Sequence, residues 1–512
     1  MADMTQQVVY WGTIGLPIAD KLPGYADFYQ VGQDVTLEDV LSPDYRNALF
    51  LLDTDASVWG DASLFAQLPA NAVLYDQQSV ISADIQRLID LKNAQAIDLH
   101  DLDRLAHVIH YDYFPGQWAF KLAYDTLRVT PAFTGDIVEN AQASTTLKGS
   151  FGQEWTPIAT WTQLTWSYGD WYETFYPECI ADVDVRFMVR VVEIQSGRLI
   201  GSYTLPAANA KAGLPFYVGK ASANIMVSMQ ARGTGSVTLG RMHINRSREK
   251  YGHLFVGGRL LSETNELAQG IATYFDAGDM KPPLIVYFSG FKLGETFEGN
   301  FLMRSFHAPF LLITDNRLSG GAFYFGSEIL EQQITAVIRK TMQRLGFNNR
   351  ELVFTGQSMG TTGALYYGAQ FLPKAVVIGK PLPEVGTIAR YGRLGRPNDF
   401  EVVDDMLTFL RGSNDEQAMT AQNDYFWQRF SHADWGKTIL GIAYMRQDDF
   451  QPDGFATIYQ ELSKQNSHVQ LLHKGISGRH NDNSPAITRW FVQIVKFVLQ
   501  KYYKREETDE WH

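Results

Sequence analysis

Residues 351–370, ELVFTGQSMGTTGALYYGAQ, decide the fold of the C-terminal half of the chain. An apolar, β-branched run is followed by Gly-Gln-Ser-Met-Gly and then by small, helix-compatible residues. This order predicts a strand, a sharp turn with Ser358 at its apex, and a helix, which is the context of a nucleophile elbow. Gly356 and Gly360 leave room for the strained backbone that lifts the serine hydroxyl toward a substrate.

A serine nucleophile of this kind also needs N–H donors for the oxyanion that forms during acyl transfer. The N–H of Met359, at the positive end of the predicted helix, is the first candidate. An apolar strand is expected at 284–288, and a Gly-bearing loop follows it at 289–294. In hydrolases of this class the corresponding loop supplies the second donor, which we place near Phe291.

A serine hydroxyl is a poor nucleophile at neutral pH, so it needs a histidine base that an acidic residue orients. His480 lies between the last expected strand, at 469–472, and a terminal helix at 486–502. Asp448 and Asp449 follow the expected strand at 439–445. Alternation along the chain turns only one of the two aspartates toward the site. We favour Asp448, with Asp449 as the other candidate.

Other residues compete for the roles of base and acid. The histidines at 432, 468 and 473 also follow the serine, but the first lies too early and the other two flank or end the last strand. Asp453 and Asp482 are the alternative acids. Since no Cys/His cluster has the spacing of a zinc site, we expect no metal and no cofactor at the serine site.

The composition narrows the class of protein. A chain of 512 residues predicts two to four domains, and a net charge of −12 argues against a general nucleic-acid binder. Cys179 is the single cysteine, which excludes an internal disulfide and fits a reducing compartment. The N-terminus lacks a secretory leader pattern, and no segment approaches 18 uninterrupted apolar residues. We therefore expect a cytoplasmic protein that is not an integral membrane protein.

The periodicity of apolar residues divides the chain into three expected domains of overall α/β class. Residues 1–130 alternate apolar runs with helical segments and predict a small α/β, Rossmann-like domain. Residues 131–262 alternate with period two between Gly-rich turns, which predicts a β-sandwich of jelly-roll type. Residues 263–512 predict an α/β-hydrolase-like catalytic domain, with an irregular insertion at 381–412 that is rich in Gly, Pro and Arg.

Two groups of side chains admit more than one interpretation. The middle domain contains four neighbouring tryptophans that either stack on a sugar or fill the sandwich core: Trp155, Trp161, Trp166 and Trp171. Near the end of the first domain, several aspartates accompany His100, His107 and His110. A solvated or capping role is favoured for these histidines over metal binding.

Four motifs together resemble the second accessory secretory protein family of the accessory Sec system, which belongs to Gram-positive bacteria. They are the Gly-Gln-Ser-Met-Gly elbow, Tyr-Phe-Ser-Gly-Phe at 287–291, Ala-Tyr-Met-x-x-Asp-Asp at 443–449 and Gly-Arg-His-Asn at 478–481. The resemblance covers most of the chain and carries the catalytic roles to Ser358 and His480. It carries the acidic role to the Asp448–Asp449 pair without choosing between them.

The resemblance implies a cytoplasmic protein that reaches the inner face of the membrane through its partners. These partners are two other accessory secretory proteins, the accessory translocase ATPase and a glycosylated serine-rich repeat adhesin. The implied activity is O-acetyl transfer to N-acetylglucosamine residues on the adhesin during its export. Because transfer to a sugar must outcompete water, we expect the middle domain with its tryptophans, helped by the 381–412 insertion, to orient the acceptor.

Three functions stay open. The first is a serine-dependent acetyltransferase or acetylesterase, whose acyl donor the sequence does not identify. The second is a non-catalytic scaffold or chaperone of the secretion complex with a relic hydrolase site, and the third is a free cytoplasmic esterase. The intact order of serine, acid and histidine favours an enzyme. The additional domains, which a free esterase does not need, count against the third.

Overall fold

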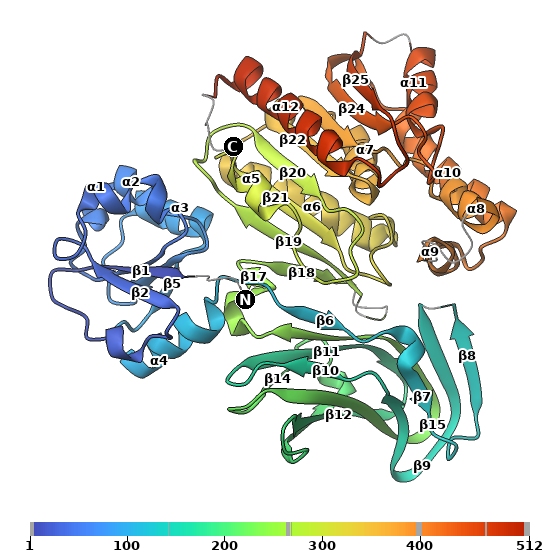
Figure 1. The fold of residues 1–512 in the computed structure, drawn as a ribbon, viewed down its shortest axis with the longest axis horizontal. Helices are drawn as coiled ribbons and strands as arrows, with labels where there is room; N and C mark the ends of the chain where they lie inside the picture. Colours follow the sequence, from blue (N-terminus) through green and yellow to red (C-terminus); the bar gives the residue numbers. More distant parts are fainter. Residues whose placement is uncertain are drawn as a thin grey trace.

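The structure is a computed structural model that describes residues 5–141, 143–262, 267, 269–395, 402–465 and 468–505. Three sheet-based parts follow one another along the chain (Figure 1), so the expected α/β class is confirmed. The N-terminal part lies at the left of the view, the middle part at the bottom, and the C-terminal part at the top and right.

The N-terminal part is a five-stranded sheet of order β2-β1-β3-β4-β5, in which every pair of strands is parallel. Its apolar runs are buried on both faces, as a parallel sheet requires. α1, α2 and α3 pack on one face and α4 on the other. The elements are β1 (Gln6–Trp11), β2 (Ala26–Gln30), α1 (Leu37–Val40), β3 (Leu49–Leu52), α2 (Ala62–Phe65), β4 (Val73–Asp76), α3 (Ala83–Lys92), β5 (Gln95–Ile97) and α4 (Leu102–His107).

The middle part is a ten-stranded sheet built around β15, which pairs antiparallel with five other strands. Register shifts between β15 and β9 mark the irregular points where these two long strands bend. Alternate residues of the strands bury a common core, in keeping with the period-two sequence pattern. The strands are β6 (Ala119–Lys121), β7 (Leu127–Val129), β8 (Asp136–Asn140), β9 (Ser144–Trp161), β10 (Thr165–Ser167), β11 (Tyr172–Ala181), β12 (Asp184–Glu193), β13 (Leu199–Pro206), β14 (Leu214–Tyr217) and β15 (Ala223–Arg246).

The C-terminal part is an eight-stranded sheet of order β18-β19-β21-β20-β22-β23-β24-β25. The first two strands run antiparallel to their neighbours, and all pairs from β21 to β25 are parallel. The strands are β18 (Arg259–Ser262), β19 (Gly270–Asp276), β20 (Leu284–Phe288), β21 (Phe310–Asp315), β22 (Leu352–Gln357), β23 (Ala375–Gly379), β24 (Ile439–Met445) and β25 (Gln470–Ile476). A separate two-stranded ribbon, β16 (Gly252–His253) with β17 (Phe255–Val256), precedes them.

Helices cover both faces of the C-terminal sheet. Residues of α6, α7, α9, α10 and α11 share a core with one set of alternate strand residues, and residues of α5 and α12 share a core with the other set. The helices are α5 (Asn300–Arg304), α6 (Glu328–Leu345), α7 (Met359–Phe371), α8 (Val385–Gly395), α9 (Val402–Arg411), α10 (Glu416–Ser431), α11 (Gly454–Lys464) and α12 (Ser484–Tyr503).

The sheets correct the sequence interpretation at three places. β6 and β7 lie within the range assigned to the first domain, yet they pair with β15 and β9 of the middle sheet. β18 lies within the range assigned to the middle domain, yet it pairs with β19 of the C-terminal sheet. The insertion at 381–412 is largely helical, as α8 and α9, because its apolar residues form helix faces that the Gly and Pro content obscured; residues 396–401 of it lie outside the described chain.

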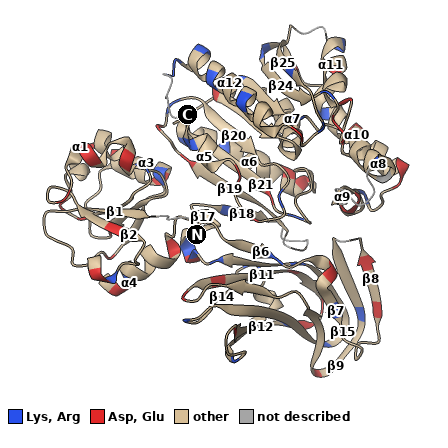
Figure 2. Ribbon diagram, in the orientation of Figure 1, with Lys and Arg blue, Asp and Glu red and all other residues tan. Residues whose placement is uncertain are grey.

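Lys and Arg are spread over all three parts and interleaved with Asp and Glu (Figure 2). Among the residues that the structure describes, no helix is both long enough and apolar enough to cross a membrane.

A buried ion pair fixes the loop that follows β21. Arg317 donates to the carboxylate of Asp315 through Nε at 2.9 Å and Nη2 at 2.7 Å, and both residues are at most 3% exposed. The carboxylate also accepts the backbone N–H groups of Ala322 and Tyr324, at 2.9 and 3.0 Å. The loop therefore depends on one carboxylate whose charge the guanidinium compensates.

We expect Arg317→Met to lower the free energy of unfolding by about 3–5 kcal/mol, because it leaves a buried carboxylate without its cation. Urea unfolding followed by tryptophan fluorescence measures the change. The matched control is Arg390→Met, which breaks the exposed pair with Glu416 and should cost less than about 1 kcal/mol. Equal losses in the two variants would contradict this role for the buried pair.

Candidate active site

Ser358 lies at the turn between β22 and α7, with φ of 52° and ψ of −123°. Neighbouring glycines make this turn sterically possible. A Cβ on Gly360 would lie 2.0 Å from the carbonyl oxygen of Phe288, and one on Gly356 would lie 2.4 Å from the carbonyl oxygen of Gly360. Strand, turn and helix thus approach too closely for any side chain at these two positions, and the serine side chain projects from the apex.

The structure brings Ser358, His480 and Asp448 into one hydrogen-bonded line. Ser358 Oγ lies 2.8 Å from His480 Nε2, and His480 Nδ1 lies 2.8 Å from Asp448 Oδ2. The three residues follow β22, β25 and β24, at the carboxyl ends of three parallel strands. Such ends lie at one edge of a sheet, where α/β proteins place their sites.

Asp448 and Asp449 contact different groups of the histidine. Asp448 contacts the imidazole, and its second carboxylate oxygen accepts the N–H groups of Phe450 and Gln451 at 2.9 and 3.2 Å. Asp449 Oδ1 accepts the backbone N–H of His480 at 2.9 Å. Asp448 therefore stands where it can orient the ring, whereas Asp449 holds the backbone of the same loop.

The surroundings of His480 keep its ring neutral. The residue is 2% exposed, and burial lowers the pKa of His480 below its ordinary value of 6.5, against the opposing effect of the Asp448 carboxylate. The positive charge of Lys380 adds to the lowering. A neutral imidazole whose Nδ1–H is bound to a carboxylate presents Nε2 as a proton acceptor toward the serine.

A pocket of about 530 Å³ opens beside the serine. Its volume falls within the range of small-molecule sites, roughly 300–1,000 Å³. The residues that line it all belong to the C-terminal part: Tyr287, Gly290, Phe291, Glu298, Gly299, Leu302, Gln357, Ser358, Lys380, Leu382, Phe450, His480, Asn481, Ser484 and Thr488. The pocket therefore combines apolar rings with several polar side chains close to the hydroxyl.

Of the two expected oxyanion donors, one directly follows the serine and the other lines this pocket. Met359 is the first residue of α7, a position whose N–H has no acceptor within the helix. Phe291 lines the pocket from the loop after β20. The N–H of the preceding residue, Gly290, donates to Glu298 Oε2 at 2.6 Å, so Glu298 fixes the backbone of this loop beside the serine.

The middle part supports the loop after β20 from its far side. Glu295 Oε1 lies 2.5 Å from Nδ1 of His243 on β15, and the N–H of Phe297 donates to Gln117 Oε1 at 2.7 Å. The middle domain, which we expect to orient an acceptor, therefore lies outside the lining of this pocket. It contacts the loop that carries Phe291 and Glu298, and the pocket lining comes from the C-terminal part.

Sequence reasoning missed two charged residues of the pocket, Lys380 and Glu298. Lys380 is 6% exposed, and its Nζ donates to Ser484 Oγ at 3.1 Å. Burial lowers the pKa of Lys380, against the attraction of Asp448 and Glu298. Both residues follow strands whose carboxyl ends meet at the serine, and this position in the sequence is the signal that could have found them.

The competing residues lie elsewhere. The histidines at 432, 468 and 473 are exposed, as are Asp453 and Asp482. Asp482 accepts the N–H of Arg479 at 2.8 Å, within the loop that carries His480. Each of these residues is thus separate from the line of contacts that joins Ser358 to Asp448.

Of the four tryptophans of the middle part, two are buried and one is exposed enough to stack on a sugar. Trp161 and Trp171 are buried, at 3% and 7% exposure, and Trp161 belongs to the sheet core. Trp155 is half-buried beneath two guanidinium groups, those of Arg186 and Arg232. Trp166 is 49% exposed and packs edge-on against Tyr168, so it is the tryptophan whose surface suits stacking on a sugar.

We expect Asp448→Asn to slow the reaction of Ser358 with a fluorophosphonate probe by roughly 10³–10⁴-fold, because the ring loses its oriented tautomer. Asp449→Asn is the matched control. It keeps an oxygen that accepts the N–H of His480, so its loss should stay below about tenfold. Gel-based labelling time courses measure both rates, with thermal melts to check folding. Equal losses in the two variants would contradict the assignment of Asp448.

The lowered pKa of His480 predicts the pH dependence of this labelling. The reactive form carries a neutral imidazole, which persists as the pH falls until the pKa of the folded protein is reached. The labelling rate should therefore fall as the pH is lowered, with a midpoint below the ordinary value of 6.5. A midpoint above pH 6.5 would show that a different group controls the serine.

Comparisons with known proteins agree with the motifs. The chain matches the family described as accessory Sec system GspB-transporter over residues 18–505. The second accessory Sec system protein of Staphylococcus aureus is 38% identical over 400 residues, which cover 78% of this chain and 76% of that protein. Its counterpart in Streptococcus gordonii is 34% identical over 443 residues, 86% of each chain.

A solved structure extends the likeness to the whole fold. The Glycosylation Associate Protein (Gap123) complex from Streptococcus agalactiae contains a chain that superposes with a TM-score of 0.86 at 27% identity. The superposition covers 98% of this chain and 100% of that one. With the match over residues 18–505, these relatives show that the chain belongs to the second accessory secretory protein family of the accessory Sec system.

Proposed function

We propose that this accessory Sec system protein is a serine-dependent acetyltransferase or acetylesterase of α/β-hydrolase type. The observation that carries the proposal is the line of 2.8 Å contacts from Ser358 through His480 to Asp448 beside a pocket. A serine, a neutral histidine and a buried carboxylate in this order form the arrangement that activates a hydroxyl for acyl transfer.

In the proposed reaction, His480 Nε2 takes the proton of Ser358 as Oγ attacks the carbonyl carbon of an acyl donor. The N–H groups of Met359 and of the backbone near Phe291 stabilise the oxyanion. The imidazolium, stabilised by Asp448, then protonates the leaving group, and an acyl-enzyme remains. A second hydroxyl, deprotonated by the same imidazole, attacks the acyl-enzyme and releases Ser358 with its proton restored.

The acceptor we propose is an N-acetylglucosamine residue on a serine-rich repeat adhesin, the cargo implied by the family. Water at about 55 M competes for the acyl-enzyme, so transfer requires a bound and oriented sugar. The polar groups of the pocket, among them Lys380, Glu298 and Thr488, are suited to hold sugar hydroxyls. The exposed face of Trp166 offers a second contact for a glycan farther from the serine.

We also propose that the protein works in a complex with the other accessory secretory proteins and the accessory translocase ATPase. A chain similar over its whole length occurs in the Gap123 complex, which supports the first partnership. The ATPase and the adhesin follow from the family role, and they would bring the protein to the inner face of the membrane.

A second candidate is a scaffold of the secretion complex with a relic site. The intact contacts of Ser358, His480 and Asp448 favour the enzyme, because a site without function need not retain buried polar groups that are costly to leave unpaired. The two candidates differ in one measurable property, which is acetylation of the adhesin glycan.

We expect Ser358→Ala to abolish both hydrolysis of a small activated acetate ester and acetylation of a glycosylated serine-rich repeat acceptor. The thermal melt should not change, because only the hydroxyl oxygen is removed. Mass spectrometry of the acceptor, incubated with the full chain, its accessory partners and an acetyl donor, measures transfer. Thr488→Val, which changes the pocket wall without touching the line of contacts, should keep ester hydrolysis.

The enzyme proposal fails if Ser358→Ala hydrolyses the ester as fast as the wild type. The transferase proposal fails, and the scaffold takes its place, if the wild-type chain with its partners never acetylates the acceptor.

A further inference from the structure

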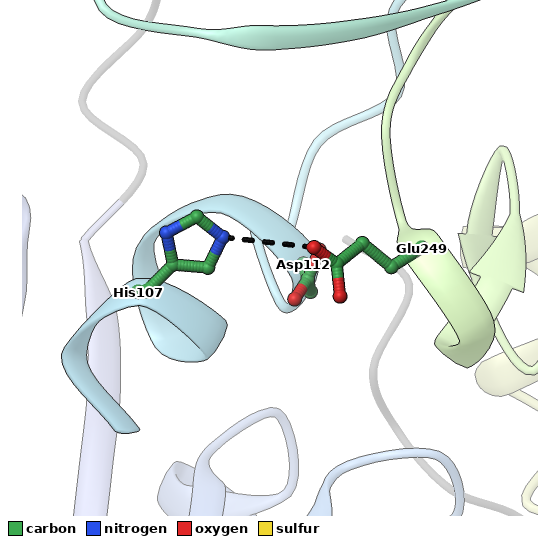
Figure 3. A group of neighbouring side chains, drawn as sticks. All are labelled: His107, Asp112 and Glu249. Carbon is green, nitrogen blue, oxygen red and sulfur yellow. Dashed lines mark ion pairs between the residues drawn. The ribbon is translucent and has the colours of Figure 1, made fainter. Parts of the chain in front are cut away.

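One imidazole and two carboxylates gather where the N-terminal part meets the middle sheet, away from the serine (Figure 3). His107 is the last residue of α4, and Asp112 ends a π-helical turn, η4 (Val108–Asp112). Glu249 begins η7 (Glu249–Tyr251), shortly after β15. One nitrogen or oxygen atom from each side chain lies within 4.8 Å of the others.

The π-helical turn brings His107 and Asp112 to one side of the chain. Along an α-helix, two residues five positions apart would point about 140° away from each other. A π-helix bonds each residue to the fifth residue beyond it, so the same spacing brings the two side chains together. In Figure 3 both side chains face Glu249 across the junction.

The carboxylate of Asp112 lacks the donors that its burial requires. The residue is 1% exposed, and its Oδ2 has no hydrogen-bond partner in the described part of the chain. Two arginines of this region donate to other atoms. Arg104 Nη2 donates to Glu249 Oε2 at 2.8 Å, and Arg248 Nη1 donates to the backbone carbonyl of Asp112 at 2.9 Å. A buried carboxylate oxygen without a donor is costly, so this oxygen favours a positive partner.

We propose that His107, Asp112 and Glu249 bind a divalent transition-metal ion of the Zn²⁺ or Mn²⁺ class. One imidazole nitrogen and two carboxylate oxygens are ligands that such ions accept, with the remaining positions open to water. His107 and Glu249 are partly exposed, which gives the ion a path from solvent.

The contacts of Glu249 divide its two oxygens between the ion and the protein. Oε2 is held by Arg104 at 2.8 Å, and Oε1 lies 3.9 Å from His107 Nε2. Arg104 therefore orients the carboxylate so that Oε1 faces the site, as residues behind metal ligands commonly do. Ligand atoms ~2.1 Å from an ion lie ~3–3.5 Å apart, so a small rotation of the side chains completes the site.

The ion would join two parts of the molecule, because His107 and Asp112 belong to the N-terminal part and Glu249 follows the middle sheet. The sequence favoured a solvated or capping role for the histidines of this region. That role fits His100, which is exposed. His110 instead stacks on Trp171 with ring centroids 5.1 Å apart, and His107 is assigned here to the metal.

The test uses the full chain, freed of metal with a chelator and then titrated calorimetrically with Mn²⁺ and, separately, with Zn²⁺. We expect one saturable site per chain, confirmed by elemental analysis, and a rise in the thermal midpoint when metal is added. Glu249→Gln and His107→Gln, which replace partly exposed ligands, should weaken binding at least tenfold. His100→Gln is the matched control and should bind as the wild type does.

Asp112→Asn separates the metal from a simpler explanation, in which Asp112 carries a proton. A protonated carboxyl resembles an amide, so under that explanation the variant melts at or above the wild type and metal shifts neither protein. Under the metal proposal, metal raises the midpoint of the wild type and not that of the variant. The proposal is overturned if neither ion binds saturably, or if Glu249→Gln and His107→Gln bind as tightly as the wild type.

Discussion

The candidate site depends on the left-handed backbone of Ser358. A residue with a side chain rarely adopts φ near +52°, and the fold retains it because β22 and α7 are both buried and meet with no intervening residue beyond the serine. The close approach of Gly360 to Phe288 then sets the distance between this turn and β20. The histidine that the serine contacts follows β25, which belongs to the same run of parallel strands as β22, so the strained turn points the hydroxyl toward the edge where His480 lies.

Burial around the serine acts differently on each charged group. It lowers the pKa of His480 and thereby favours a neutral imidazole, and it lowers the pKa of Lys380 although two carboxylates oppose the change. The buried carboxylate of Asp448 is compensated by hydrogen bonds, because the imidazole and two backbone N–H groups all bind its oxygens. The polar groups of the site thus compensate one another. If one partner is removed, the others stay buried without a hydrogen bond, and the protein bears the full cost of their desolvation.

The local sequence was enough to predict the parts of the site in which the same short segment carries the reactive residue and determines its backbone geometry. The glycines around Ser358 predict the turn, and the positions of His480 and the two aspartates after strands predict the edge at which they meet. Lys380 and Glu298 were missed because their neighbours come from distant loops. The helix α9 was missed because the Gly and Pro residues around it dominate a local reading. β6 and β7 have only three residues each, too few for a period, and only pairing with long strands defines them.

The loop after β20 belongs to two parts of the molecule at once. Its Glu298 shapes the pocket, while its Glu295 is buried against His243, where burial is outweighed by the carboxylates of Glu295 and Glu178, which raise the pKa of His243 to about 9. The C-terminal part is therefore not a removable module. Excision of the middle sheet would remove the imidazole that pairs with Glu295 and uncover this face of the loop, so the loop that flanks the serine would lose contacts that fix it. The pocket and the middle sheet are thus mechanically coupled through this loop, although no residue of the middle sheet lines the pocket.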